Sequence, residues 1–305
     1  MEYMRIIINR LIVMVIYAAI GFILHKTKLV SKQGCTAFST LLVYILLPCV
    51  IIQSFLRDFS ALQTRSMLLA MVISIGLLLL SCVVSSFLFR KEKIDAFSSA
   101  FSNAGFMGVP LIASALGQEA VFYSAGFVAF LNILQWVYGQ TVLVPTQGKK
   151  RHLSACIRNP LMVALVIGLA CYFFQLPLPE QLRSCISTLS ACNTPVAMII
   201  LGYYLCEIPL RNIFTLPAAY AVSLSRLLLV PILSIGVLAL VPGVSTEIKM
   251  ALVIVASAPV GINAAVYAQR LNLDYTRAVI LICHSTVFSV ITMPLIVLCA
   301  SMVFQ

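Results

Sequence analysis

The stretch "SNAGFMGVP" (Ser102–Pro110) interrupts a segment that is otherwise apolar enough to cross a lipid bilayer. Glycine and proline weaken or break a helix, and Asn103 adds polar groups that lipid does not satisfy. In a membrane helix, unwound backbone is tolerated only where it is buried in protein or lines a water-filled cavity. Either this segment does not span a membrane, or the interruption is part of its function.

Composition decides that the segment belongs to a membrane protein. The chain of 305 residues is 62% hydrophobic and only 10% charged, and its mean hydropathy is +1.07. Such values exclude an ordinary soluble domain. Apolar stretches of about 20 residues recur along the whole chain, which is the length that spans hydrocarbon. We predict an all-α membrane protein with ten transmembrane helices, at about 6–25, 35–56, 66–89, 95–117, 119–144, 159–176, 181–206, 212–240, 247–269 and 276–303.

The basic residues predict the orientation of these helices. Thirteen of the twenty Lys and Arg residues fall in connections on one side: Lys26, Lys28, Lys32, Arg90, Lys91, Lys93, Lys149, Lys150, Arg151, Arg158, Arg211, Arg270 and Arg277. Six lie on the other side (Arg5, Arg10, Arg57, Arg65, Arg183 and Lys249), and Arg226 lies within a span. The positive-inside rule places the thirteen in the cytoplasm and both termini outside the cytoplasmic membrane. The run "GKKRH" (148–152) is then a topology signal that can contact anionic lipid, and we predict no nucleic-acid binding.

Two pairs of landmarks indicate an internal repeat. Pro48 in the second span lies 147 residues before Pro195 in the seventh, and Pro110 lies 149 residues before Pro259 in the ninth. These offsets predict two five-helix halves, 1–147 and 148–305. Because five is odd, the second half enters the membrane from the opposite face, which is the inverted repeat of many secondary transporters.

The fourth and ninth spans are predicted to be broken helices that meet near the midplane. The N-terminal ends of the half-helices carry partial positive charge and free N–H groups, which together suit an anion such as a carboxylate. The candidate substrate-binding residues are Asn103, Gly105, Gly108, Pro110, Pro259, Gly261 and Asn263. Ser99, Ser102 and Ser257 are interpreted as helix-packing groups, and Gln53, Asn132, Gln135, Asn193 and His284 as weaker candidates.

Arg226 is the eighth candidate. It lies some ten residues inside a span, too deep for easy snorkelling, and a charge at that depth faces the bundle interior or a cavity. The acidic residues cluster at helix ends, so Arg226 either attracts an anion or pairs with some other internal group.

The remaining motifs argue against an enzyme. The ten cysteines stand singly without a CxxC pair, so disulfide and metal sites are poorly supported. The chain has no HExxH motif, nucleophile elbow or phosphate-cradling glycine loop. We predict neither catalysis nor a metal or cofactor. Coupling to a proton, through His284, or to a sodium ion is left open, as is a homodimer.

Four motifs resemble the auxin efflux carrier family, which includes plant PIN-type carriers. "NAGFMGVPLIASALG" (103–117) and "APVGINAAVYAQRLNLD" (258–274) are similar to that family's two crossover helices. "LLPCVII" (46–52) and "SLSRLLLVP" (223–231) fall where the family has a second-helix proline and an eighth-helix arginine before a proline. The resemblance spans the whole chain.

The resemblance implies ten helices in two inverted repeats, with a fold like that of bile acid:sodium symporters. Helices 1, 2, 6 and 7 would form a scaffold, and helices 3–5 and 8–10 a transport domain that moves in the manner of an elevator. Members carry organic anions such as auxin, malate or malonate. The link between helices 5 and 6 is only about a dozen residues here, and Asn263 has no strict counterpart in the plant pattern. A bacterial-type carrier of a small mono- or dicarboxylate is therefore expected; the alternatives are a channel-like uniporter and an anion-binding membrane receptor.

Overall fold

The computed structural model describes residues 2–143, 160–207 and 210–304, and the regular secondary structure within these ranges is helical, joined by turns and short irregular connections and with one isolated antiparallel bridge. The basic run 148–152 and the boundary at 147/148 between the two predicted halves lie outside the described residues. The elements of the N-terminal part are α1 (Glu2–Lys26), α2 (Lys32–Leu41), η1 (Leu42–Leu46), α3 (Leu47–Phe55), α4 (Ala61–Leu88), α5 (Lys93–Ala100), η2 (Ala104–Gly108), α6 (Val109–Ala115), α7 (Gln118–Tyr138) and η3 (Gly139–Leu143). Those of the C-terminal part are α9 (Pro160–Phe174), α10 (Glu180–Glu207), α11 (Leu210–Thr215), α12 (Pro217–Leu224), η4 (Ser225–Leu229), α13 (Val230–Leu240), α14 (Thr246–Ser257), α15 (Asn263–Arg270) and α16 (Tyr275–Val303).

Seven helices in the described part are long and apolar enough to cross a membrane: Ile8–Lys26, Lys32–Phe55, Ala61–Leu88, Glu119–Tyr138, Glu180–Cys206, Pro217–Leu240 and Tyr275–Val303. Each coincides with one of the ten predicted spans. The other three predicted spans, at 95–117, 159–176 and 247–269, contain shorter helices. The chain is thus a multi-pass helical membrane protein, and the ten-helix inverted repeat stays a prediction.

Two of these three segments are interrupted by non-helical backbone. The first runs through α5, η2 and α6, and its non-helical residues are 101–103. We took Pro110 as the landmark of this break, but the proline lies beyond it, within the continuous helical run Ala104–Ala115 that η2 and α6 form. The second segment is broken between α14 and α15, and Pro259 lies within that break.

Three prolines share a local setting that explains why helices continue through them. Pro48, Pro110 and Pro231 are each the second residue of an α-helix that directly follows a π-helical turn, η1, η2 or η4. A π-helical turn widens the helix by one residue, which gives the proline ring room beside the preceding carbonyls. Pro195 instead lies inside the continuous helix α10, so the two prolines that we matched as repeat landmarks have different surroundings.

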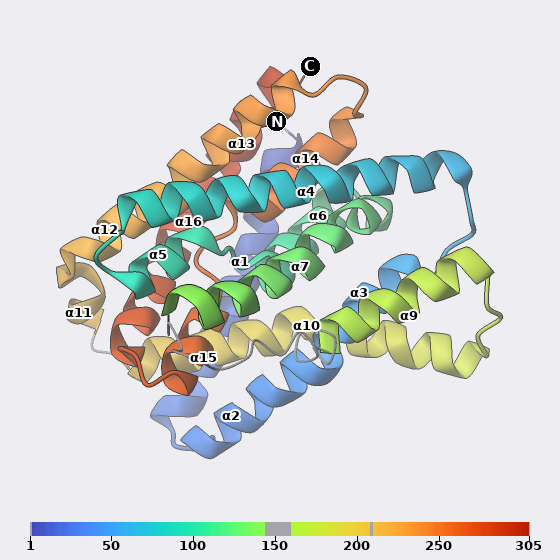
Figure 1. Ribbon diagram of the computed structural model, residues 1–305. Helices are drawn as coiled ribbons and strands as arrows, with labels where there is room; N and C mark the ends of the chain where they lie inside the picture. Colours follow the sequence, from blue (N-terminus) through green and yellow to red (C-terminus); the bar gives the residue numbers. More distant parts are fainter. Residues whose placement is uncertain (1, 144–159, 208–209, 305) are drawn as a thin grey trace.

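The helices pack as two groups, and their mutual border is where the site lies. In the first group, α10 packs against α1 and α3, and α3 also packs against α9. In the second group, α4 runs along one face over α5 and α7, while α16 contacts α12, α14 and α15 (Figure 1). The border between the groups includes contacts of α1 with α6 and of α3 with α7. Side chains from both groups therefore meet along this border.

Candidate functional site

The two broken segments cross each other through their backbones. The Asn103 N–H donates to the Pro259 carbonyl at 2.7 Å, and the Gly261 N–H donates to the Phe101 carbonyl at 3.0 Å. Between these bonds Ser102 and Val260 form an antiparallel bridge. The extended residues of each segment thus satisfy each other's polar groups, as backbone inside a membrane protein must.

Gly261 allows this close approach. A Cβ added to Gly261 would lie 3.0 Å from the Ser102 carbonyl oxygen and 3.4 Å from that of Phe101. Gly108 allows a similar close approach between η2 and α14, since a Cβ added to it would lie 3.1 Å from the Val255 Cα. Both contacts are with backbone atoms that cannot rotate aside, so side chains at these two predicted site residues would push the segments apart.

Two serine side chains hold the crossing in place. The Ser102 hydroxyl donates to the Val255 carbonyl at 2.8 Å. The Val260 N–H in turn donates to the Ser285 hydroxyl oxygen of α16 at 3.1 Å. Ser102 and Ser285 are buried, so these bonds are shielded from water and tie the crossing to α14 and α16.

Arg226 satisfies the carbonyl ends of both half-helices that lead into the crossing. Its side chain is buried, and it donates to the Ser99 and Ala100 carbonyls of α5 at 3.1 and 3.0 Å and to the Ala256 carbonyl of α14. It also donates to the Ser81 hydroxyl at 3.2 Å. The carbonyl end of a helix carries partial negative charge, so Arg226 compensates two such ends at once.

The opposite ends of the half-helices have no such counter-charge among the described residues. The first N–H groups of a helix have no acceptor within that helix, and at α15 the Ala264 and Ala265 N–H groups donate instead to the Gly261 and Ile262 carbonyls, at 3.0 and 3.1 Å. The crossing is therefore electrostatically asymmetric: Arg226 compensates the carbonyl ends of α5 and α14, whereas the N-terminal ends of η2 and α15 keep a partial positive charge that suits an anion.

Asn103 and Asn263 lie on the two segments but in different surroundings. Asn103 is buried, and its Nδ2 has no acceptor among the described residues. The Asn263 amide is half-buried and donates to the Gln135 Oε1 at 2.7 Å and to the Asn132 Oδ1 at 3.3 Å, both on α7. Asn103 is thus the amide with unused hydrogen-bonding capacity, whereas Asn263 belongs to a cluster of three amides.

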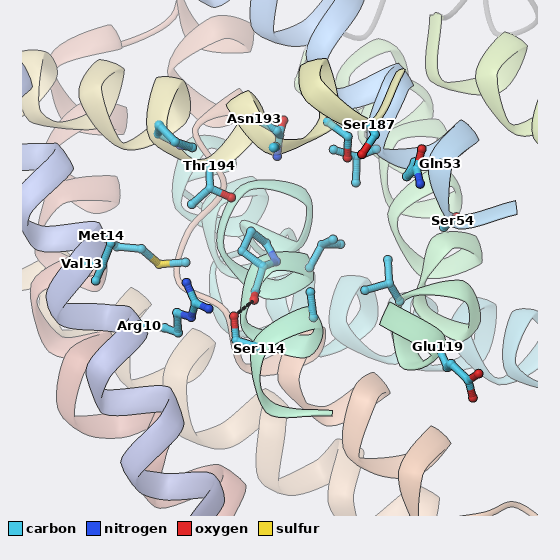
Figure 2. A pocket seen from close by; sticks show the side chains of 18 of the residues that line it. Arg10, Val13, Met14, Gln53, Ser54, Ser114, Glu119, Ser187, Asn193 and Thr194 are labelled. Atoms are coloured by element: carbon cyan, nitrogen blue, oxygen red, sulfur yellow. Dashed lines mark hydrogen bonds between the residues drawn. The ribbon is translucent and has the colours of Figure 1, made fainter. Parts of the chain in front are cut away.

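A cavity of about 710 Å³ lies next to the crossing, between the two helix groups. Its polar and charged lining residues include Arg10, Gln53, Ser54, Arg57, Ser114, Glu119, Ser187, Ser190, Asn193 and Thr194, which come from α1, α3, α6, α7, α10 and the turn after α3 (Figure 2). The Glu119 side chain is 72% exposed, which marks where the cavity meets the surface. The volume falls within the range of small-molecule sites.

Asn193 connects the cavity to the crossing. It lines the cavity, yet its Nδ2 donates to the Gly105 carbonyl of η2 at 3.2 Å. Its Oδ1 is buried and receives no hydrogen bond from any described residue, and the same holds for the Gln53 Oε1. Unpaired buried oxygens are costly, so these two amides are available to a ligand or to water.

The predicted site residues are therefore only partly brought together. Asn103, Gly105, Gly108, Pro259, Gly261 and Asn263 lie at or beside the crossing, while Pro110 alone of the eight lines the cavity. Sequence reasoning ranked Gln53 and Asn193 low and did not consider Arg10, Ser114 or Glu119. Arg10 and Glu119 resemble ordinary charges at span ends, and only the packing of α6 against both α1 and α7 brings the two to one cavity.

Comparison with known proteins identifies the family. The sequence profile of the membrane transport protein family matches residues 6–297. The chain belongs to this family, the auxin efflux carriers. This confirms the resemblance seen in the sequence motifs.

Two relatives of this transport protein have similar lengths. A protein of Rhizobium meliloti (strain 1021) named "Putative malonate transporter" is 26% identical over 275 residues, which cover 83% of each chain. An "Uncharacterized transporter" of Methanothermobacter thermautotrophicus (strain ATCC 29096 / DSM 1053 / JCM 10044 / NBRC 100330 / Delta H) is 24% identical over 288 residues, covering 90% of this chain and 92% of the relative. Membership in a transport family fits the expectation that the protein moves a substrate rather than converting it.

Proposed function

We propose that this protein is a secondary transporter that moves a small organic anion across the cytoplasmic membrane by alternating access. The observation that carries the proposal is the backbone crossing of the two broken segments beside a polar cavity. The N-terminal ends of η2 and α15 offer partial positive charge to a carboxylate, and Arg226 compensates the carbonyl ends of α5 and α14 that would repel one.

The packing of the helices supports an elevator mechanism. We assign α1, α2, α3, α9 and α10 to a scaffold, and the two broken segments with α4, α7, α12, α13 and α16 to a transport domain. Contacts are extensive within each set, and the cavity lies where the sets meet. A rigid transport domain that carries the crossing past the scaffold would expose the same site to each side in turn. We include the inverted five-helix repeat, which stays a prediction, in this proposal.

We infer the class of substrate from the charged residues that line the cavity and from the name of a relative. The cavity lining contains two arginines and one glutamate, so it favours anions. The Rhizobium meliloti relative is named for malonate, a small dicarboxylate. We propose a mono- or dicarboxylate, with an auxin-like weak acid as a further candidate. The positive-inside orientation would make the cavity open to the outside, because Arg57 and Glu119 lie in connections predicted to be extracytoplasmic.

Counterflow in proteoliposomes tests this proposal. Wild-type protein should exchange at least one of labelled malate, malonate, lactate or indole-3-acetate in a saturable manner, and Asn103→Ala should lose this exchange. The substitution keeps the backbone bond from residue 103 to Pro259, so the crossing stays intact and only the amide is removed. Asn212→Ala, at an exposed position on α11, is the matched control and should behave as wild type.

The alternatives predict different results. Flux without saturable counterflow would favour a channel-like uniporter with the crossing as a fixed filter. Anion binding without any exchange would favour a membrane receptor. Exchange that survives Asn103→Ala would keep the carrier but move its substrate contact away from this side chain.

A further inference from the structure

Three charged side chains line the cavity, and two of them neutralise each other. The Arg57 guanidinium lies 3.5 Å from the Glu119 carboxylate, and it also covers the Phe122 ring at 4.8 Å from the ring centroid. The Arg57 side chain is 19% exposed and the Glu119 side chain 72%, so the pair lies where the cavity meets the surface. Arg57 is thus committed to partners within the protein and contributes little net charge to the cavity.

Arg10 is an exposed cavity-lining residue that forms no ion pair with any described side chain. It lies two residues inside the apolar helix Ile8–Lys26, on the same face of α1 as Val13, Met14 and Tyr17, which also line the cavity. Among the described side chains, no carboxylate lies within ion-pair distance of Arg10. A cation at the edge of a membrane span is costly unless it meets water or an anion. Its place in the cavity allows either.

The far wall of the cavity carries neutral hydrogen-bonding groups. In the view of Figure 2, Arg10 and Ser114 lie toward one side of the cavity, and Gln53 and Asn193 lie toward the other. The amide oxygens of Gln53 and Asn193 are the two acceptors that lack a donor. A ligand that spans the cavity therefore meets a single positive charge at one end and unused acceptors at the other, which suit an O–H group rather than a second carboxylate.

We propose that Arg10 binds the substrate's carboxylate, and that the cavity consequently prefers small anions with one negative charge. A hydroxy acid fits this description, as does a dicarboxylate that carries one proton. A dianion would place its second charge against the acceptor oxygens of Gln53 and Asn193. This inference rests on the proposed transport function and assigns its charge recognition to a residue outside the crossing.

The test compares charge variants in the counterflow assay, with labelled lactate as the monoanion and labelled malonate at alkaline pH as the dianion. Arg10→Gln should weaken the apparent affinity for lactate by roughly tenfold or more, the scale of a lost charge-assisted hydrogen bond. Arg10→Lys should restore part of it. Arg65→Gln removes an equal charge from an exposed position on α4 outside the cavity, and should match wild type.

A second variant tests the charge count directly. Glu119→Gln removes the partner of Arg57 and gives the cavity a second uncompensated cation. The ratio of malonate to lactate affinity should therefore rise in this variant relative to wild type. Melting temperatures of all variants in detergent separate a loss of folding from a loss of recognition.

The outcomes distinguish this inference from the proposed function. If wild type exchanges an anion and a folded Arg10→Gln variant exchanges it with unchanged affinity, the assignment of Arg10 is wrong while the carrier stands. An unchanged malonate-to-lactate ratio in Glu119→Gln would overturn the single-charge preference. If wild type exchanges no anion at all, the proposed function fails, and the inference falls with it.

Discussion

At the residue scale, Arg226 shows how a buried charge can be stabilised without a carboxylate. Its partners are the carbonyl ends of α5 and α14 and one hydroxyl group. Its guanidinium presents several donors in a rigid planar arrangement, which lets it contact carbonyls of two different segments. We therefore propose that Arg226 supports the substrate site by holding the crossing together rather than by touching the anion.

Replacing Arg226 should destabilise the protein. Arg226→Ala leaves the carbonyls of Ser99, Ala100 and Ala256 buried without a donor, which should cost about 3 kcal/mol or more. A lower melting temperature in detergent and a smaller folded fraction are the expected results, with partial rescue by Arg226→Lys. Arg183→Ala, on the exposed part of α10, is the control and should melt as wild type does. An Arg226→Ala variant that melts like wild type but binds no anion would instead indicate direct substrate contact.

At the element scale, the crossing of α1 and α10 fixes one wall of the cavity. A Cβ at Gly202 would overlap the Ala18 carbonyl oxygen, and one at Gly21 would overlap that of Ile199. The two helices thus touch backbone to backbone, as small residues allow in membrane proteins. This contact sets the position of Arg10 on α1 relative to Asn193 on α10.

Enlarging Gly202 should separate these two helices. Gly202→Val places a branched side chain where only hydrogen fits, so we expect little monodisperse protein in size-exclusion chromatography and rapid digestion by protease. Gly76→Val provides the control, because a Cβ at Gly76 on α4 meets no heavy atom within 4 Å. A Gly202→Val protein with normal yield and normal exchange would show that α1 and α10 do not need this close contact.

At the scale of the whole molecule, the cavity lies between the two helix groups that we propose to move relative to each other. α1, α3 and α10 line one side, and α6 and α7 line the other. The only described polar side-chain link from the cavity to the crossing is the bond from Asn193 to Gly105. Elsewhere the border carries the Arg57–Glu119 ion pair and the hydrogen bonds of the Tyr172 hydroxyl with Thr64 and Ser60, so a sliding transport domain would have to break and remake these contacts at each step.

Filling the cavity should stop transport without unfolding the protein. Ala113→Trp introduces an indole into the lining of α6, where the volume of about 710 Å³ can hold it. Counterflow should disappear, while the melting temperature stays at or above that of wild type because apolar surface is buried. Ala239→Trp, on an exposed face of α13, should leave exchange unchanged. Undiminished exchange in Ala113→Trp would mean that the substrate does not pass through this cavity.

The sequence by itself determined the class of the protein, its family and the presence of two interrupted helices. Hydropathy and breaker residues act locally, so runs of apolar residues predicted the helices and the "SNAGFMGVP" stretch predicted an interruption close to its true place. The motifs around Asn103 and Pro259 were enough to indicate the auxin efflux carriers, which the family match confirmed.

Only the tertiary structure decided which groups meet. Phe101 and Gly261 are far apart in the chain, and their hydrogen bond depends on how whole helices pack. The partners of Arg226 are backbone carbonyls, which every residue carries and which no sequence pattern can single out. The cavity likewise combines side chains from α1, α3, α6, α7 and α10. A charge such as Arg10 becomes a candidate for recognition only when packing places it, without an ion-pair partner among the described residues, beside a polar cavity.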